Sequence, residues 1–212
     1  MPKGIKAIVS NRPGETRHIQ LYQLSSEIIS ATKNPQADNE KEKGKKMSLI
    51  LADVPGYGFA YASEEKAQEW QGLLAEFLLY RGKSLKRILL LIDARHGFKK
   101  ADYDFIESLE NELANNRKKE DAKRQPGKRS LQLPPIQIVL TKCDLVTQND
   151  LARRVVQVRQ NLSDALVREP SALPVMLVCA KAGLGFNNVR GNVARGGILE
   201  LQRELAALVP QQ

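Results

Sequence analysis

The fold is decided by the stretch Leu-Ile-Leu-Ala-Asp-Val-Pro-Gly-Tyr-Gly-Phe-Ala, residues 49–60. Its uninterrupted apolar start predicts a strand buried on both faces, and the proline and glycines that follow Asp53 predict a loop. In open parallel sheets, ligands bind at the carboxyl ends of the strands. An Asp at that edge can hold a magnesium ion or its waters, while a glycine N–H faces a phosphate. We therefore expect a ligand site at Asp53.

Strands and helices alternate along the rest of the chain. Further strands are expected at 18–24, 88–92, 136–140 and 175–178. Helices are expected to begin at Ser63 and to cover 102–114, 149–168 and 198–208. This alternation predicts an α/β doubly wound three-layer sandwich with a mostly parallel sheet, in one domain that spans residues 1–212. Two lysine-rich insertions, at about 25–46 and 115–134, are expected to interrupt it.

Two of the expected helices carry an apolar stripe at helical spacing. In the first helix the stripe consists of Ala67, Trp70, Leu73, Leu74, Phe77 and Leu78. In the second it consists of Phe105, Ile106, Leu109 and Leu113. We expect these side chains to form the core, and Trp70 to be a core residue rather than a ligand contact.

Composition narrows the class of protein. The chain has 212 residues, 42% hydrophobic and 27% charged, enough for one substantial core. It contains no apolar run of the roughly 20 residues that a membrane-spanning helix needs, and its first ten residues lack a signal-peptide core. The two cysteines, Cys143 and Cys179, have no metal-ligand spacing, which predicts a reducing compartment and no disulfide. The protein is expected to be neither secreted nor membrane-inserted, and monomeric.

The net charge of +9 is unevenly distributed. Residues 117–129 hold seven Lys or Arg against Glu120 and Asp121. Such an excess suits an anionic partner such as RNA, because counterion release favours binding without sequence readout. The alternative is a solvated, disordered insertion, and the charge pattern alone leaves both open.

Two strand ends have a direct chemical interpretation. In Thr141-Lys142-Cys143-Asp144, the Asp carboxylate can accept both N–H donors on one edge of guanine while the lysine stem lies across the base. Adenine presents an acceptor there and would leave the carboxylate unpaired. In Cys179-Ala180-Lys181, the Ala180 N–H can donate to the guanine carbonyl. The order of these motifs, after Asp53-Val54-Pro55-Gly56, predicts a guanine site.

These residues resemble the EngB (YihA/YsxC) family of translation-factor-like P-loop GTPases. The specific match is 53–60, where Tyr57 and the second glycine are particular to that family. Asp93-Ala94-Arg95-His96-Gly97, Trp70 with Tyr80-Arg81, and a Pro13-Gly14-Glu15-Thr16 loop similar to its switch I also fit it. The resemblance spans about residues 5–208.

The resemblance implies a role for each matching residue. Thr16 corresponds to the switch I magnesium ligand and Asp53 to a second-shell magnesium carboxylate. The loop over the γ-phosphate corresponds to Gly14, Glu15, Thr16, Arg17 and His18, and the segment with the γ-phosphate donor to Asp53, Val54, Pro55 and Gly56. Guanine readout corresponds to Thr141, Lys142, Cys143 and Asp144, and closure over the base to Val178, Cys179 and Ala180.

The family also implies a function and a location. It implies binding of GTP or GDP with magnesium, slow hydrolysis, and a role in assembly of the large ribosomal subunit, with a link to cell division and septation. The expected partner is ribosomal RNA or a large-subunit assembly intermediate. The expected compartment is the cytoplasm, or a mitochondrial or plastid matrix if a targeting segment precedes residue 1.

The sequence departs from the family at the phosphate loop. Gly-X-X-X-X-Gly-Lys-Ser/Thr does not occur in the 212 residues, and with it are missing a strand, the phosphate lysine and a magnesium ligand. We expect this loss to expose two apolar strand edges and to make GTP binding weak or absent. An incomplete chain and a degenerate family member both account for it.

Smaller departures concern catalysis. Glu15 and Arg17 replace an arginine and a glutamine of switch I, and Cys179 stands where the family often has serine. Tyr57 lies near the place of the water-orienting glutamine of Ras-like enzymes, so no catalytic base is assigned. The alternative functions are a pseudo-GTPase that binds RNA or the ribosome without catalysis, and a doubly wound phosphatase or hydrolase. The sequence disfavours the last, because no phosphate-cradling Arg loop or Gly-X-Ser-X-Gly is present.

Overall fold

The computed structural model describes residues 19–28, 45–57, 64–123, 133–179 and 197–209. The chain divides into two compact units, Met1–Gly56 with Leu205–Gln212, and Tyr57–Glu204. The expectation of a single domain stays a prediction.

The first unit contains an antiparallel hairpin. Strand β1, Gln20–Ile28, pairs with β2, Lys45–Asp53, in a register that runs from Gln20 opposite Asp53 to Ile28 opposite Lys45. Both expected strands are therefore confirmed. They are longer than expected, since 25–28 and 45–46 belong to the hairpin instead of to the insertion predicted at about 25–46. Residues 29–44 of that insertion lie outside the described part.

The prediction that the strand at 49–53 is buried on both faces is wrong. Ile50 is 61% exposed, and Leu49 and Leu51 are half-buried. Among the described strands β2 pairs only with β1, and a two-stranded ribbon has no second layer to cover its apolar side chains. An apolar run therefore identified the strand correctly but did not identify what covers it.

The second unit contains a parallel sheet in the order β3-β4-β5. Strand β3, Ile88–Asp93, lies beside β4, Ile136–Thr141, in a register from Ile88 opposite Ile136 to Asp93 opposite Thr141. Strand β5 is short, Met176–Leu177, and pairs with the carboxyl-terminal half of β4. This arrangement confirms the expected α/β fold with a parallel sheet.

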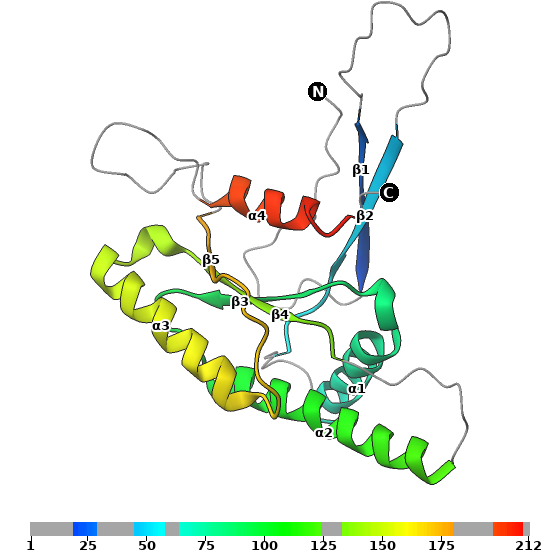
Figure 1. The fold of residues 1–212 in the computed structure, drawn as a ribbon. Helices are drawn as coiled ribbons and strands as arrows, with labels where there is room; N and C mark the ends of the chain where they lie inside the picture. Colours follow the sequence, from blue (N-terminus) through cyan, green and yellow to red (C-terminus); the bar gives the residue numbers. More distant parts are fainter. Residues whose placement is uncertain (1–18, 29–44, 58–63, 124–132, 180–196, 210–212) are drawn as a thin grey trace, which may run out of the picture. The chain divides into compact units, whose positions relative to one another are not determined.

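Helices cover both faces of this sheet. The helices are α1 Glu64–Tyr80, α2 Lys100–Lys123, α3 Gln148–Ala165 and α4 Ile198–Ala206, with short 3-10 turns η1 Gly82–Ser84 and η2 Cys143–Leu145. Figure 1 shows α2 and α3 on one face of the sheet and α4 on the other. From α4, Leu201 packs against Val139, Met176 and Val178. The three layers expected from the alternation of elements are therefore present in this unit.

The apolar faces of α1 and α2 differ in how well they match the expectation. All four residues expected on α2 are buried, which confirms its stripe. On α1, Leu74 and Leu78 are buried as expected, but Leu73 is exposed and Ala75 and Leu79 are buried instead. The pairs Leu73-Leu74 and Leu78-Leu79 each offer two apolar neighbours, so spacing alone placed the stripe about one residue too early. Trp70 is half-buried.

Helix α2 is longer than the sequence indicated. It runs to Lys123, so the insertion predicted at 115–134 begins as nine residues of helix, 115–123. These residues include no glycine or proline, but they are polar and carry no apolar periodicity that would reveal a helix. Buried Asn116 ties the extension to the preceding turn, since its amide donates to the Glu112 carbonyl at 2.9 Å.

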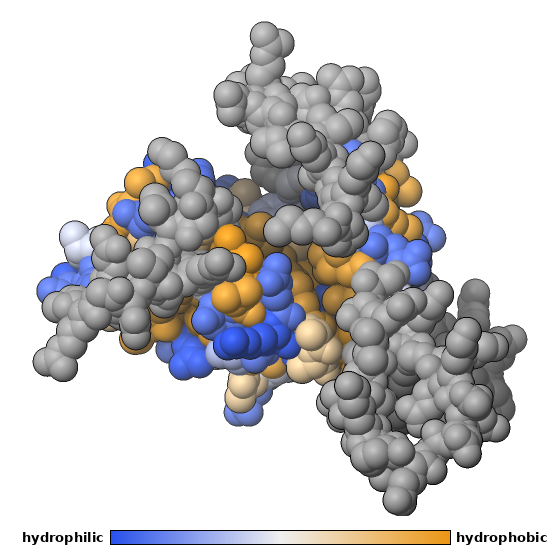
Figure 2. All heavy atoms as spheres, turned by 90° about the horizontal axis from the view of Figure 1, so that it is seen from above, coloured by the Kyte–Doolittle hydropathy of each residue, from blue (hydrophilic) through white to orange (hydrophobic). Residues whose placement is uncertain are grey.

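Strand β3 has one edge without a partner strand in the described part of the chain. The Ile88 and Ala94 N–H groups donate to the Pro135 and Thr141 carbonyls, which places β4 along the other edge. Leu90 is 4% exposed, whereas Leu91 is 62% exposed, so the expected burial of 88–92 is wrong at Leu91. Apolar side chains that reach the surface among charged ones are also visible in Figure 2.

We predict opposite outcomes for alanine at two adjacent positions of β3. Leu90→Ala removes a buried side chain and should lower the free energy of unfolding by about 2–5 kcal/mol, because it leaves a cavity. Leu91→Ala is the matched control and should change it by less than about 0.5 kcal/mol. Urea unfolding followed by circular dichroism measures both. Equal losses would show that Leu91 is covered by a part of the chain outside the described residues.

Candidate functional site

The carboxyl ends of β3, β4 and β5 meet at one edge of the sheet. The ladder continues just past the strands, since Ala94 N–H donates to the Thr141 carbonyl at 2.9 Å and Val178 N–H donates to the Leu140 carbonyl at 2.8 Å. Asp93, Thr141 and Val178 therefore lie in a row along this edge. The residues expected to read guanine and those expected to close over the base share this edge, apart from Ala180, which lies outside the described residues.

The turn after β4 has a strained backbone. Lys142 has φ 56° and ψ 35°, the left-handed region, and it is the one such non-glycine residue in the described part. Because L side chains are disfavoured there, the conformation persists only where the surroundings enforce it. Here the Cys143 N–H donates to the Val178 carbonyl at 3.3 Å, and the Leu145 N–H donates to the Lys142 carbonyl at 3.0 Å.

This turn presents Asp144 to solvent. Cys143 is 2% exposed, and its thiol donates to the Leu140 carbonyl at 3.1 Å. Its buried side chain therefore holds the turn against the core. Asp144 is the second residue of the η2 turn and is exposed. Within the described residues its carboxylate accepts no hydrogen bond. No described residue therefore occupies either oxygen, which suits a ligand that offers two donors.

Asp93 pairs with the lysine of the same turn. The Lys142 ammonium lies 3.0 Å from Asp93 Oδ2, and the Arg95 guanidinium lies 2.7 Å from the same oxygen. The hydrogen bonds from Arg95, and after them the hydrogen bond and charge of Lys142, hold the pKa of Asp93 well below its ordinary value of 3.8, although partial burial acts in the opposite direction. Asp93 is therefore a carboxylate at neutral pH.

Tyr57, which follows the Asp53-Val54-Pro55-Gly56 segment, is bound to helix α2. Its hydroxyl donates to Asp102 Oδ1 at 2.5 Å, and its ring stacks on Phe105 with centroids 4.3 Å apart. Asp102 Oδ2 also accepts the Lys99 N–H at 2.5 Å. Burial, and then the hydrogen bond and charge of Asp102, raise the pKa of Tyr57 far above its ordinary value of 10.0. The phenol stays protonated and cannot act as a base.

The other expected site residues belong to the first unit or lie outside the described residues. Asp53 ends β2 opposite Gln20 and is exposed, and Asp53, Val54, Pro55 and Gly56 all belong to the first unit. Ala180 lies outside the described part. So do the residues expected to close over the γ-phosphate, which are Gly14, Glu15, Thr16, Arg17 and His18.

The described residues alone do not form a metal centre. They contain no group of three or more His, Cys, Asp or Glu side chains close enough to hold a metal ion. Magnesium in nucleotide sites is commonly held by one or two protein groups together with phosphate oxygens. The expected contributions of Thr16 and Asp53 therefore remain predictions.

One contact of the loop after β3 could not be predicted from the sequence. Arg154 of α3 reaches the loop after β3, where its guanidinium donates to the carbonyls of Ala94, Arg95 and His96 at 3.0, 3.2 and 3.3 Å. Backbone carbonyls are present at every position, so no residue pattern announces such a contact. The Arg95-His96 motif by itself gives no indication of Arg154.

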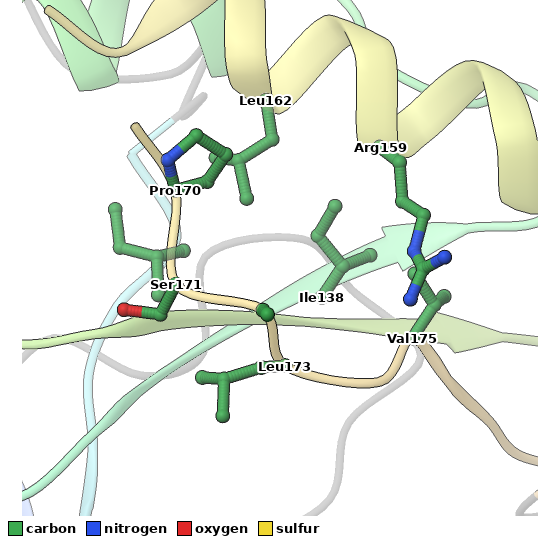
Figure 3. A pocket seen from close by; sticks show the side chains of 9 residues that line it. Ile138, Arg159, Leu162, Pro170, Ser171, Leu173 and Val175 are labelled. Atoms are coloured by element: carbon green, nitrogen blue, oxygen red, sulfur yellow. The ribbon is translucent and has the colours of Figure 1, made fainter. Parts of the chain in front are cut away.

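Two other features resemble ligand sites but carry none of this chemistry. A Gly-Lys-Ser triplet at 82–84 follows helix α1 instead of a strand, and the Ser84 hydroxyl donates to the Arg81 carbonyl. A groove of about 250 Å³ lies between α3, the start of β4 and residues 170–175, as Figure 3 shows. Ile136 and Ile138 line this groove near the start of β4, at the opposite end of the strand from Thr141.

Comparison with known proteins identifies the family. Residues 2–142 match the family model described as 50S ribosome-binding GTPase. A probable GTP-binding protein EngB of Ruegeria sp. (strain TM1040) is 31% identical over 193 residues, which cover 91% of this chain and 68% of the relative. The chain belongs to the EngB family of GTPases.

Other EngB proteins match less of their own length. The probable GTP-binding protein EngB of Rhodopseudomonas palustris (strain HaA2) is 34% identical over 69% of this chain and 57% of the relative. That of Bradyrhizobium diazoefficiens is 33% identical over 72% of this chain and 58% of the relative. The chain therefore spans between just over half and about two thirds of these EngB relatives. In its described part, no helix is both long and apolar enough to cross a bilayer.

We predict that Cys143 is unreactive at neutral pH. Burial, and to a smaller extent nearby negative charges, raise the pKa of Cys143 from 9.0 to about 11. At pH 8 its thiolate fraction should be about 100-fold lower than that of a thiol with the ordinary pKa, because each pKa unit changes it tenfold. Alkylation by iodoacetamide, followed by mass spectrometry, should be slow and should still accelerate above pH 9.

The same chain in urea provides the control for this measurement. Unfolding should restore rapid alkylation, since both the burial and the nearby charges are lost. A native-state rate that levels off near pH 9 would contradict the predicted environment of Cys143.

Proposed function

We propose that this EngB-family chain binds a guanine nucleotide, GDP or GTP, at the edge formed by the ends of β3, β4 and β5. The observation that carries the proposal is the position of Asp144, an exposed carboxylate on the turn after β4. The backbone of this turn is hydrogen-bonded to Val178, and its Cys143 is buried. A preorganised acceptor pair of this kind suits a ligand that presents two parallel donors.

Guanine is the base that offers those donors. Its ring N–H and its exocyclic amine point in the same direction and can donate to the two Asp144 oxygens. Adenine offers an acceptor at the corresponding ring nitrogen, which would face a carboxylate and leave it unpaired. Lys142 would lay its stem across the base, while Val178, Cys179 and Ala180 would close the other side.

The phosphate end of the nucleotide would have fewer contacts with these 212 residues than the base. Asp53 and Gly56 would serve the magnesium and the γ-phosphate, with Thr16 and the loop 14–18 closing over them. These 212 residues contain no Gly-X-X-X-X-Gly-Lys-Ser/Thr, so they supply few of the family's phosphate contacts. We therefore expect affinities no tighter than roughly micromolar, about −8 kcal/mol.

The proposed partner is ribosomal RNA or an assembly intermediate of the large ribosomal subunit. The family description and the basic segment 117–129 support this proposal. Arg117 and Lys118 are exposed near the end of α2, where their charges can contact the phosphates of a nucleic-acid backbone. A role in cell division and septation rests on the family resemblance alone. The proposed compartment is the cytoplasm or an organelle matrix, and the proposed state is a monomer.

A second candidate is a pseudo-GTPase that binds RNA without hydrolysing GTP. The state of Tyr57 favours it, since the phenol is a hydrogen-bond donor to Asp102 and cannot accept a proton from water. This candidate shares the base site with the first proposal. A nucleotide that binds but is not turned over would favour it.

The first test exchanges the base preference. Asp144→Asn replaces one acceptor oxygen by an amide donor, which suits xanthine, where a carbonyl takes the place of the guanine amine. We expect GDP affinity to fall about 10- to 100-fold, the typical effect of losing a hydrogen bond to a charged group, and xanthosine diphosphate affinity to rise. Titration followed by NMR measures affinities in the expected weak range.

The matched control is Asp164→Asn, an exposed acid of α3 that accepts a hydrogen bond from Gln160 within its own helix. It makes the same change of charge and should leave both affinities as in the wild type. If the wild type shows no saturable GDP binding, or if Asp144→Asn leaves the preference for GDP unaltered, the proposed base site is wrong.

The second test concerns RNA. Arg117→Ala with Lys118→Ala should weaken binding to ribosomal RNA severalfold and should reduce the slope of log K against log salt by about 2, one for each lost phosphate contact. The control is Lys83→Ala with Lys86→Ala, two exposed cations elsewhere in the second unit. Equal effects of the two pairs would show that only net charge matters and would contradict a dedicated site on α2.

A further inference from the structure

The Asp93 carboxylate is fully occupied by donors. Its Oδ1 accepts the Arg95 backbone N–H and Nε, both at 3.0 Å, and its Oδ2 accepts Arg95 Nη2 at 2.7 Å. The Lys142 ammonium lies 3.0 Å from Oδ2, and His96 Nδ1 lies 3.8 Å from the same oxygen. A carboxylate that is bidentate to a planar guanidinium has a fixed orientation. Lys142 is therefore paired with an acceptor that cannot easily turn toward it or away from it.

The loop that carries Arg95 is held from a second element. Arg154 donates to three successive carbonyls of this loop, and its Nη1 also donates to Gln157 of the same helix at 2.7 Å. Gly97 has φ +70°, and a Cβ there would collide with the Arg154 guanidinium. The close approach of Arg154 therefore requires a glycine at 97. Helix α3, through Arg154, holds the loop in one conformation.

These contacts have a consequence for the Lys142 side chain. Its backbone is in the left-handed region and its ammonium is paired with Asp93, so the side chain is held at both ends. A lysine side chain loses much of its rotamer freedom when it is ordered, which opposes binding. Where that ordering precedes binding, a ligand that lies against the stem does not have to supply it.

We propose that Asp93 is a positioning residue for nucleotide recognition: it holds the Lys142 ammonium so that the lysine stem is ordered for the face of a purine ring. Arg95 orients Asp93, and Arg154 fixes the loop that carries Arg95. The role rests on the proposed function, because the ring would be that of the nucleotide read by Asp144. Asp93 itself does not touch the base in this arrangement, so it acts through Lys142.

The proposal assigns different effects to Asp93 and Asp144. Asp144 supplies hydrogen bonds that distinguish guanine from xanthine. Asp93 orders an apolar stem, which contacts any purine in the same way. A change at Asp93 should therefore weaken all purine nucleotides alike and leave the ratio of the GDP and xanthosine diphosphate affinities unchanged.

The test is a double-mutant cycle between Asp93→Asn and Lys142→Met in the full 212-residue chain. Asparagine has the shape of aspartate without its charge, and methionine keeps most of the stem without the ammonium. We expect Asp93→Asn to weaken GDP binding roughly 3- to 30-fold in the wild type and to have no further effect when Met occupies position 142, as expected for coupled residues. Asp164→Asn is the charge-matched control and should be neutral.

A second measurement needs no nucleotide. The Lys142 ammonium, observed by ¹⁵N NMR, should exchange its protons slowly in the wild type, because it is paired, and should become indistinguishable from surface lysines in Asp93→Asn. A merely structural role of Asp93 would lower stability but would leave its effect on GDP binding the same in the Lys142→Met background.

The two proposals fail in different ways. Absence of GDP binding in the wild type overturns the base site, and the positioning role with it. GDP binding that is unaffected by Asp93→Asn, an effect that persists with Met at position 142, or an altered preference between the two bases overturns the positioning role of Asp93 alone.

Discussion

Parallel pairing of β4 with both β3 and β5 is the constraint on which the candidate site depends. Parallel strands end at the same edge, so the pairing of Asp93 with Thr141 and of Leu140 with Leu177 brings three separate segments together. A shift of one residue in either register would turn every side chain of a strand to the opposite face. Asp93 would then point away from Lys142. The buried side chains of Ile138 and Leu140 therefore also secure the register of the site.

The sequence predicted the elements better than it predicted their surroundings. Apolar runs located β2, β3 and β4, and helical spacing located the buried face of α2, because these patterns reflect the local period of the backbone. The same patterns could not show that Ile50 and Leu91 are exposed, since exposure depends on which other element covers a strand. The end of α2 was missed for the opposite reason, because a polar helix without apolar periodicity resembles a loop.

The residues of the candidate site also differ in whether a local sequence pattern could reveal them. Thr141-Lys142-Cys143-Asp144 and Val178-Cys179 could be found because short motifs after apolar runs are local features. The pairing of Asp93 with Lys142 could have been anticipated only from the strand order, since the two residues lie in different segments. The contact of Arg154 with three carbonyls could not be predicted, because no sequence pattern marks a backbone carbonyl as its partner.

Tyr57 and Asp102 connect the first loop of the second unit to a helix. Asp102 is buried and serves two donors at once, the Tyr57 hydroxyl and the Lys99 N–H at the start of α2, while Phe105 stacks on the tyrosine ring one turn later. Withdrawal of the phenol would leave a buried carboxylate short of a donor, which is costly in a dry interior. The packing of the first turn of α2 therefore depends on a side chain that precedes the helix by more than forty residues, through the contact of Tyr57 with Asp102.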